Sequence, residues 1–256
     1  MNPPVLPSIR PKAKTRPSPT EPILLLVAAN WREFKPLCGL EGHFAPCEIG
    51  LRWAAWGALN GRLAILAAHG PGRANARQAV ETACAQFAVS ALVSTGVAGA
   101  LDPDFRVADT FLPSLVIEFR TQVEYAVRLP AFCPEGARRG RLLTVDTVIQ
   151  DADSKADLRD QGAEAVDMEA SAVAAEAQIR GLPFYCVRSI SDDAAASFPL
   201  DFNRARRDDG TFSGWELAAQ VALEPSSLKE LWALRRNAEA ACQALGSFLQ
   251  GCEFES

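Results

Sequence analysis

The apolar residues of this chain fall into short unbroken runs and into stretches with helical spacing. Residues 23–29, ILLLVAA, form an unbroken run, which is typical of a strand buried on both faces. An Asn-Gly pair at 60–61 separates the apolar segments 51–59 and 62–68, and this arrangement predicts a β-hairpin. Further strands are predicted at residues 91–96, 110–118, 121–127, 140–149 and 183–190.

Helical spacing is found in other segments. Residues 74–87 place apolar side chains on one face, as an amphipathic helix does. A second helix is predicted to follow residues 166–169, and residues 224–249 are predicted to form one or two closing helices. Because helices alternate with strands and a hairpin is also present, we expect an α/β fold with layers around a mixed sheet.

The first 22 residues differ in composition from the rest of the chain. They hold seven of the 17 prolines, and they carry four basic residues against one acidic residue. This composition is typical of a disordered arm, and it lacks the apolar stretch of a secretory signal. We therefore expect a Pro-rich basic arm over residues 1–22 and a single folded domain over residues 23–256.

Charge and composition exclude several classes of partner. The net charge of −5 divides into an arm at +3 and a remainder with 22 basic and 30 acidic residues, at −8. A remainder this acidic argues against duplex nucleic acid, because phosphate contacts need clustered basic side chains. No apolar run approaches the roughly 18 residues of a membrane span, so stable membrane insertion is not expected. The arm offers only weak, salt-sensitive attachment to a partner or an anionic surface.

The cysteines follow no metal-binding or disulfide pattern. There are seven of them without a CxxC pair, and the chain has only two histidines. We therefore expect no metal site, and reduced thiols in a cytoplasmic protein.

Candidate chemistry gathers where predicted strands end, which is where open α/β sheets bind ligands. Segments 30–33, 96–99, 167–169 and 191–192 all occupy such ends. The two glycines of 96–99 allow close approach of the backbone to a ligand. Their spacing differs from GxGxxG, and no suitable acidic residue follows, so a dinucleotide cofactor is not expected.

Charged residues at these ends have both structural and functional interpretations. Asp167 and Glu169 either cap a helix, or offer a carboxylate to vicinal hydroxyls such as those of a ribose. Arg188 lies in an apolar run, and burying it requires a partner, which we expect to be a carboxylate such as Glu169 or Glu33. Asp192 is either a general acid or a helix cap.

Three segments together resemble a known family. AANWREFKPL (28–37), STGVAGAL (94–101) and AVDMEASAVAAEAQIRGLPFYCVRSISD (165–192) are similar to the nucleoside phosphorylase/nucleosidase family, in particular its methylthioadenosine/S-adenosylhomocysteine nucleosidase branch. The resemblance covers residues 23–193. It implies a three-layer α/β/α fold with a mixed central sheet and a single catalytic domain. It also implies cleavage of the N-glycosidic bond of a small-molecule nucleoside by water or phosphate, without a metal or organic cofactor.

The resemblance also implies roles for individual residues. Glu33 would activate water, Glu169 with Met168 would bind the ribose hydroxyls, and Arg188 would orient carboxylate and nucleophile. Asp192 would protonate purine N7, as in members that favour 6-amino purines. Cleavage leaves positive charge on the ribose and negative charge on the base, so carboxylates at one end and an acid at the other suit the reaction. Further substrate contacts are implied for Gly96, Val97, Ala98, Val148 and Ile149.

The chain also departs from the nucleosidase pattern. Val148 replaces an aromatic residue that stacks on the base, and Val97 replaces a frequent serine. The segment 118–142 is short, and it joins LLTVDTVI (142–149) and SFPLDFN (197–203) in resembling hopanoid-associated phosphorylases, which are proposed to release adenine from adenosylhopane. These departures leave the 5′ substituent open, and they leave a non-catalytic nucleoside-binding protein as the alternative.

The nucleophile and the assembly stay open as well. Glu33 favours water, whereas Arg32 and Arg73 are candidates for binding phosphate as a co-substrate. Arg73 follows Gly-Pro-Gly at 70–72, whose N–H groups are able to bind an anion, although it also fits a solvated position in a helix. The family forms dimers, trimers and hexamers, so the resemblance implies a homo-oligomer.

Overall fold

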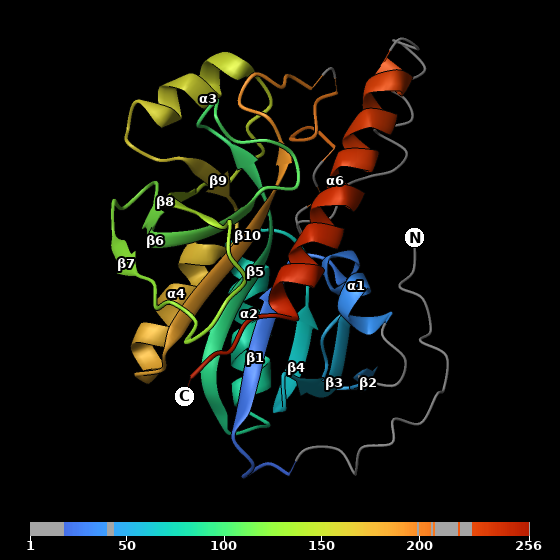
Figure 1. Ribbon diagram of the computed structural model, residues 1–256, viewed down its shortest axis with the longest axis vertical. Coiled ribbons are helices and arrows are strands. Elements are labelled where there is room, and N and C mark those ends of the chain that lie inside the picture. The colour runs from blue at the N-terminus through green and yellow to red at the C-terminus, as the bar shows by residue number, and fades with distance from the viewer. Residues whose placement is uncertain are drawn as a thin grey trace.

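A mixed sheet runs through the computed structural model of the protein (Figure 1). The structure describes residues 18–39, 44–198, 200–205, 207, 220 and 227–255, and the side chains at 227–229 are left out. Most of the predicted arm, residues 1–17, therefore lies outside the described residues. Within the described part, ten strands join in one sheet.

The first half of the sheet is built around β1 (Ile23–Ala28). All six of its residues are buried, as the apolar run predicted. It lies between two parallel neighbours, β4 (Arg62–Ala68) and β5 (Val89–Ala100). β3 (Trp53–Leu59) pairs antiparallel with β4, which confirms the hairpin, and the turn residues Asn60 and Gly61 both have positive φ. At the edge, β2 (Phe44–Pro46) pairs with β3.

The second half of the sheet closes into a ring of five strands, which the sequence did not predict. The long strand β5 makes closure possible, because residues 92–99 pair with one neighbour and Gly99 and Ala100 pair with another. The remaining members of the ring are, in order, β9 (Ala165–Asp167), β8 (Arg138–Thr144), β6 (Thr110–Glu118) and β10 (Phe184–Asp192). A short strand, β7 (Glu124–Ala126), pairs antiparallel with β6.

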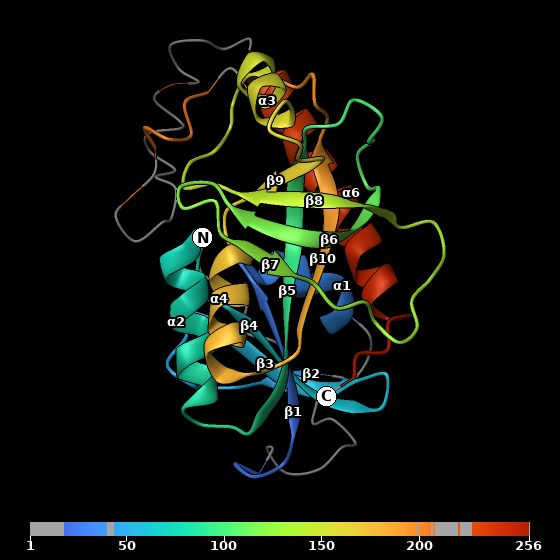
Figure 2. The same cartoon turned by 90° about the vertical axis from the view of Figure 1, so that its left-hand side faces the viewer.

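Helices cover both faces of the sheet, so the fold has the expected three layers. One face carries α2 (Arg73–Cys84) and α4 (Ala170–Arg180), which lie side by side (Figure 2). The other face carries η1 (Trp31–Phe34), α1 (Lys35–Cys38) and α6 (Ser227–Leu249).

Alternate residues of β1 serve the two apolar cores between these layers. Leu25 packs in the cluster that includes Val80 of α2, whereas Leu26 packs in the cluster that includes Leu245 of α6. This alternation is the two-residue period of a strand.

Several predicted boundaries were wrong. The strand predicted at 140–149 ends at Thr144, and the residues after it leave the sheet. The helix α3 (Ala152–Arg159) was not predicted, because only Lys155 and Leu158 are buried in it and it has no apolar period. The strand predicted at 121–127 shortens to β7. Described residues of the closing segment form one helix, α6, while 221–226 lie outside the described part.

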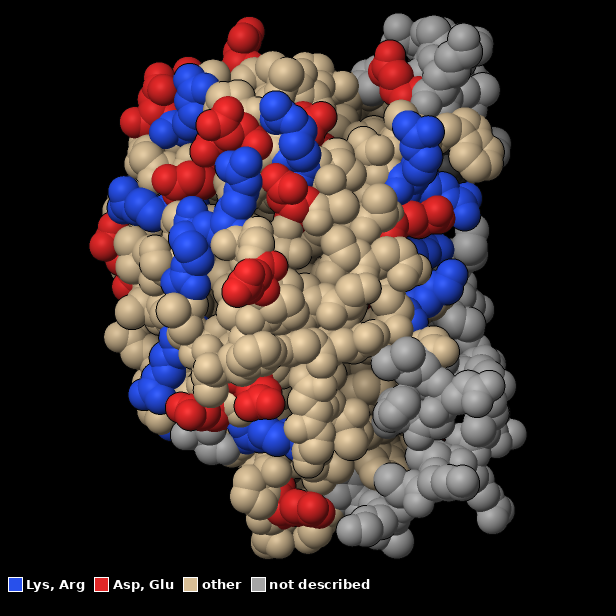
Figure 3. All heavy atoms as spheres, in the orientation of Figure 1, with Lys and Arg blue, Asp and Glu red and all other residues tan. Residues whose placement is uncertain are grey.

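The surface charges, the cysteines and the helices also bear on the predictions. Acidic and basic side chains are interspersed on the face that Figure 3 shows, without a large region of one sign. All seven cysteines are free, as expected. No helix in the described part of the chain is long and apolar enough to cross a membrane.

Candidate active site

A cavity of ≈ 230 Å³ opens where parallel strands of the sheet end. Segments following β1, the second half of β5, the end of β10 and the start of α4 all contribute to its wall. This position is the one expected for ligands in α/β sheets. Residues predicted from the sequence that line it are Glu33, Val97, Ala98, Val148, Ile149, Met168, Glu169 and Asp192.

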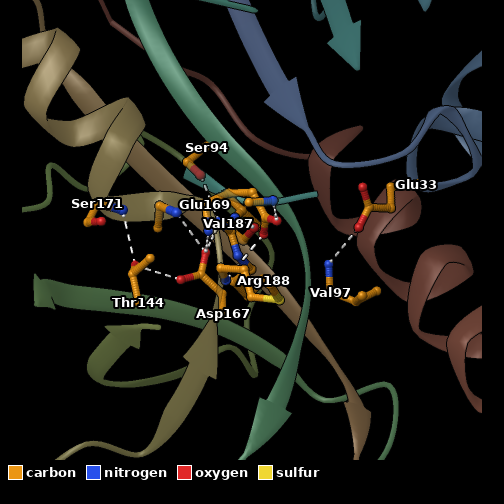
Figure 4. A network of polar contacts seen from close by, with 12 residues as sticks. Glu33, Ser94, Val97, Thr144, Asp167, Glu169, Ser171, Val187 and Arg188 are labelled. Carbon is orange, nitrogen blue, oxygen red and sulfur yellow. Dashed lines mark hydrogen bonds and ion pairs between the residues drawn. The ribbon is translucent and has the colours of Figure 1, made fainter. Parts of the chain in front are cut away.

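Glu33 reaches the cavity because η1 begins directly after β1. Asn30 is the N-cap of η1, and its side chain accepts a hydrogen bond from the N–H of Arg32 at 3.1 Å. The Glu33 carboxylate accepts from the N–H of Asn30 at 2.8 Å. It also accepts from the N–H of Val97 at 3.3 Å (Figure 4). The side chain is only 6% exposed, and this burial raises its pKa against the opposing effect of the hydrogen bonds.

Gly96 is required beside Glu33 for a steric reason. Its φ is +147°, and a Cβ at this position would lie 2.9 Å from Oε1 of Glu33. Any larger residue would strain the backbone and displace the carboxylate. Gly96 therefore supports the cavity from behind and does not line it.

Glu169 is held at the start of α4 by backbone N–H groups. Oε1 accepts from Gly72 at 2.6 Å and Oε2 accepts from Met168 at 3.3 Å. The N–H of Gly72 belongs to the glycine turn that was a candidate for binding phosphate, and it binds the chain's own Glu169. Burial, followed by the charge of Asp167, raises the pKa of Glu169 to about 7.

Arg188 pairs with Asp167, so the expectation of Glu169 or Glu33 as its partner was wrong. Its Nη2 lies 2.6 Å from Oδ2 of Asp167 and 2.7 Å from Oγ of Ser94. Both charged side chains are almost completely buried, and Arg188 lies behind the cavity wall. The carboxylates at 33 and 169 bind backbone N–H groups instead, as described above.

Asp167 also joins β9 to α4. Its Oδ2 accepts from the N–H of Ala170 at 2.8 Å, and its Oδ1 accepts from the hydroxyl of Thr144 at 2.6 Å. The same hydroxyl accepts from the N–H of Ser171 at 3.1 Å (Figure 4). The capping interpretation is therefore confirmed for Asp167, whereas Glu169 faces the cavity.

Asp192 ends β10 in the cavity wall, where it contacts a residue of α3. Its Oδ2 lies 2.5 Å from Nζ of Lys155, and its Oδ1 accepts from the hydroxyl of Ser191 at 2.7 Å. A Cβ on Gly99 would come within 3.0 Å of Oδ2, so this glycine leaves room for the carboxylate.

An apolar wall faces these carboxylates. Val148 and Ile149 line it where the chain leaves β8, and Asn203 fixes the segment by binding the N–H and the carbonyl of Val148, both at 2.9 Å. Phe198 adds an aromatic ring to the same cavity. An aromatic side chain is therefore present although Val148 replaces the expected one.

The two arginines proposed to bind phosphate lie away from the cavity. Arg73 forms ion pairs with Glu118 and with Asp146, the latter at 2.9 Å. Arg32 is exposed, with its guanidinium 5.4 Å from the centre of the Trp31 ring. Neither side chain lines the cavity.

Three residues of the site were missed or only partly predicted from the sequence. Asp167 was predicted either to cap a helix or to bind ribose hydroxyls, and its contact with Arg188 was not predicted. That contact depends on how β9 pairs with its neighbouring strands. Lys155 lies in the unpredicted helix α3, where a lysine ordinarily faces water. Phe198 belongs to the segment 197–203, which carried a family resemblance without a structural position.

Known proteins resemble this chain in sequence and in fold. A family model described as the phosphorylase superfamily matches residues 24–211. Curated relatives include the 5′-methylthioadenosine/S-adenosylhomocysteine nucleosidases of Staphylococcus haemolyticus, 25% identical over 57% of this chain and 75% of the relative, and of Treponema pallidum, 28% identical over 50% of this chain and 65% of the relative.

Solved structures agree on the fold. Futalosine hydrolase of Helicobacter pylori superimposes with a TM-score of 0.65 at 18% identity, over 90% of this chain and 95% of the other. The 5′-methylthioadenosine/S-adenosylhomocysteine nucleosidase of Neisseria meningitidis, in complex with methylthio-immucillin-A, gives 0.61 at 20% identity, over 89% and 100%. The family match spans the sheet from the second residue of β1 onward, and it includes every cavity residue named above. The chain therefore belongs to the phosphorylase superfamily.

Proposed function

We propose that the protein is a nucleosidase that hydrolyses the N-glycosidic bond of a purine nucleoside, with adenine as the base. One observation carries the proposal: Glu33, Glu169 and Asp192, from three separate elements, line the same small cavity. The related nucleosidases make this chemistry the first candidate for such a site.

Breaking the glycosidic bond places positive charge on the sugar and negative charge on the base. In the proposed reaction, Glu169 accepts hydrogen bonds from the ribose hydroxyls and stabilises the cationic sugar. Glu33 takes the proton of the attacking water, and burial raises its pKa, which makes it a stronger base than an ordinary glutamate. Asp192 protonates the departing base, which the apolar wall and Phe198 hold.

Water is favoured over phosphate by the electrostatics of the cavity. Two glutamates, Glu33 and Glu169, lie at the sugar end, and a phosphate ion placed between them would meet like charge. Arg73 is engaged by two carboxylates of its own. Inorganic phosphate is therefore not a co-substrate in this proposal.

Base release by the purified protein tests the proposal. Adenosine, two 5′-thioadenosines and inosine are incubated with it, and free base is separated by chromatography. We expect adenine from at least one adenosine derivative, and a loss of about 10²–10⁴-fold in Glu33→Gln, Glu169→Gln and Asp192→Asn. The exposed Glu48 provides the control, since Glu48→Gln should keep wild-type activity. Nucleoside binding in a calorimeter without release of base from any substrate would show a binding protein and contradict the proposal.

A further inference from the structure

Lys155 is a buried cation in the wall of the candidate active site. It is 1% exposed and lies in α3 (Ala152–Arg159), the helix that the sequence did not predict. Its Nζ lies 2.5 Å from Oδ2 of Asp192 and donates to the carbonyl of Asp193 at 2.7 Å. The ring of Phe198 lies 5.3 Å from the same nitrogen.

Stability alone does not account for a lysine at this position. A buried ion pair gains little over apolar residues of the same volume, because both charges lose their hydration. Lys155 and Asp192 also line the cavity. The Asp192 carboxylate could therefore be hydrated by water there, and it does not need an ion pair for its solvation. A lysine held against the group that faces the departing base therefore points to a role in the reaction.

We propose that Lys155 is a positioning residue for Asp192: it fixes the orientation of the carboxyl group and supplies the proton that Asp192 passes to the departing base. This inference rests on the proposed function. Two of the three N–H donors of the Lys155 ammonium form hydrogen bonds, one to the Asp192 carboxylate and one to the carbonyl of Asp193. The hydroxyl of Ser191 binds Oδ1, so both carboxyl oxygens have fixed neighbours.

The proton count of the step balances. The bond between C1′ and the base nitrogen breaks, and its electron pair stays on the base. The ion pair starts as ammonium and carboxylate. As the bond breaks, one proton passes from Lys155 to Asp192 and from Asp192 to the base, which leaves a neutral amine and a carboxylate, and solvent then returns a proton to Lys155. Water adds to C1′ and loses one proton to Glu33, which returns it to solvent, so the products are a neutral base and a free sugar.

Lys155→Met, Asp192→Asn and the double variant form a cycle that tests the inference by base release. We expect Lys155→Met to lose about 10²–10⁴-fold in kcat, the range of general acid catalysis, while KM changes little. In the Asp192→Asn background the same substitution should cost less than about threefold, because Lys155 acts through Asp192. Lys155→Arg should recover at least about tenfold over Lys155→Met, since it keeps charge and donors.

Folding is controlled within the same set of proteins. The double variant removes both charges, so it leaves no unpaired buried ion even where Lys155→Met lowers the melting temperature. Lys155→Met within threefold of wild type, or losses that multiply in the double variant, would overturn the inference. Wild-type protein that releases no base from any nucleoside would instead overturn the proposed function.

Discussion

At the scale of single residues, backbone N–H groups hold the two glutamates of the cavity. Glu33 binds Asn30 and Val97, and Glu169 binds Gly72 and Met168. Burial raises the pKa of both glutamates, and it outweighs the opposing effects of these hydrogen bonds and of the Arg188 charge. These hydrogen bonds orient both carboxylates toward the cavity, where the proposed reaction forms a cationic sugar.

The pKa of Glu169 leads to a prediction about stability. Between pH 4.5 and about 7, the folded protein keeps a proton on Glu169 that the unfolded chain has already lost. The free energy of unfolding therefore contains a contribution that is present below pH 4.5 and is lost as the pH rises through about 7. Glu169→Gln lacks this contribution, so its stability relative to wild type should rise across the window, by at most about 1.4 kcal/mol per pH unit. Urea unfolding at pH 5 and pH 7.5 measures the difference, and a constant difference at both pH values would contradict the prediction.

Residue identities in the site were predicted better than their partners. The predicted strand ends and the family resemblance identified Glu33, Glu169 and Asp192, because both signals are read from short stretches of the sequence. The partner of Arg188 depends on the lateral pairing of β9 with β5, which no local pattern records. Lys155 was missed for a similar reason, since only tertiary packing buries it.

At the scale of elements, the long strand β5 organises the site. Its first half continues the sheet from β1, and its second half turns from that sheet into the ring through β9. The strands and the hairpin were predicted by their apolar runs, whereas the ring was not, because closure depends on which strand edges meet. Gly96 and Gly99, on this second half, leave space for Glu33 and Asp192 respectively.

A glycine substitution in β5 tests this role. Gly96→Ala would strain a residue at φ +147° and place Cβ 2.9 Å from the Glu33 carboxylate, so we expect base release to fall at least tenfold. Gly181→Ala is the matched control, because it also has positive φ, at +65°, but meets no atom within 4 Å. Both variants should lose about 1–2 kcal/mol of stability from backbone strain. Equal activity of the two variants would show that Gly96 does not position Glu33.

At the scale of the whole molecule, charge and fold support the proposal of a small nucleoside as the ligand. The acidic remainder of the chain, at −8, forms a cavity with four carboxylates in its wall, Glu33, Asp167, Glu169 and Asp192. The family match over residues 24–211 confirms the resemblance found at 23–193 and extends it beyond the cavity. Specificity for the 5′ group and the expected homo-oligomer stay predictions, because both depend on surfaces that the resemblance does not determine.

The most direct measurement is base release from a 5′-substituted adenosine, with the sugar product identified in the presence and absence of inorganic phosphate. We expect the protein to release adenine at a rate independent of phosphate and to yield only the free sugar, because the role proposed for Glu33 is to activate water. A sugar 1-phosphate as the product would contradict the hydrolytic assignment. The absence of base release under both conditions would contradict the proposed nucleosidase activity.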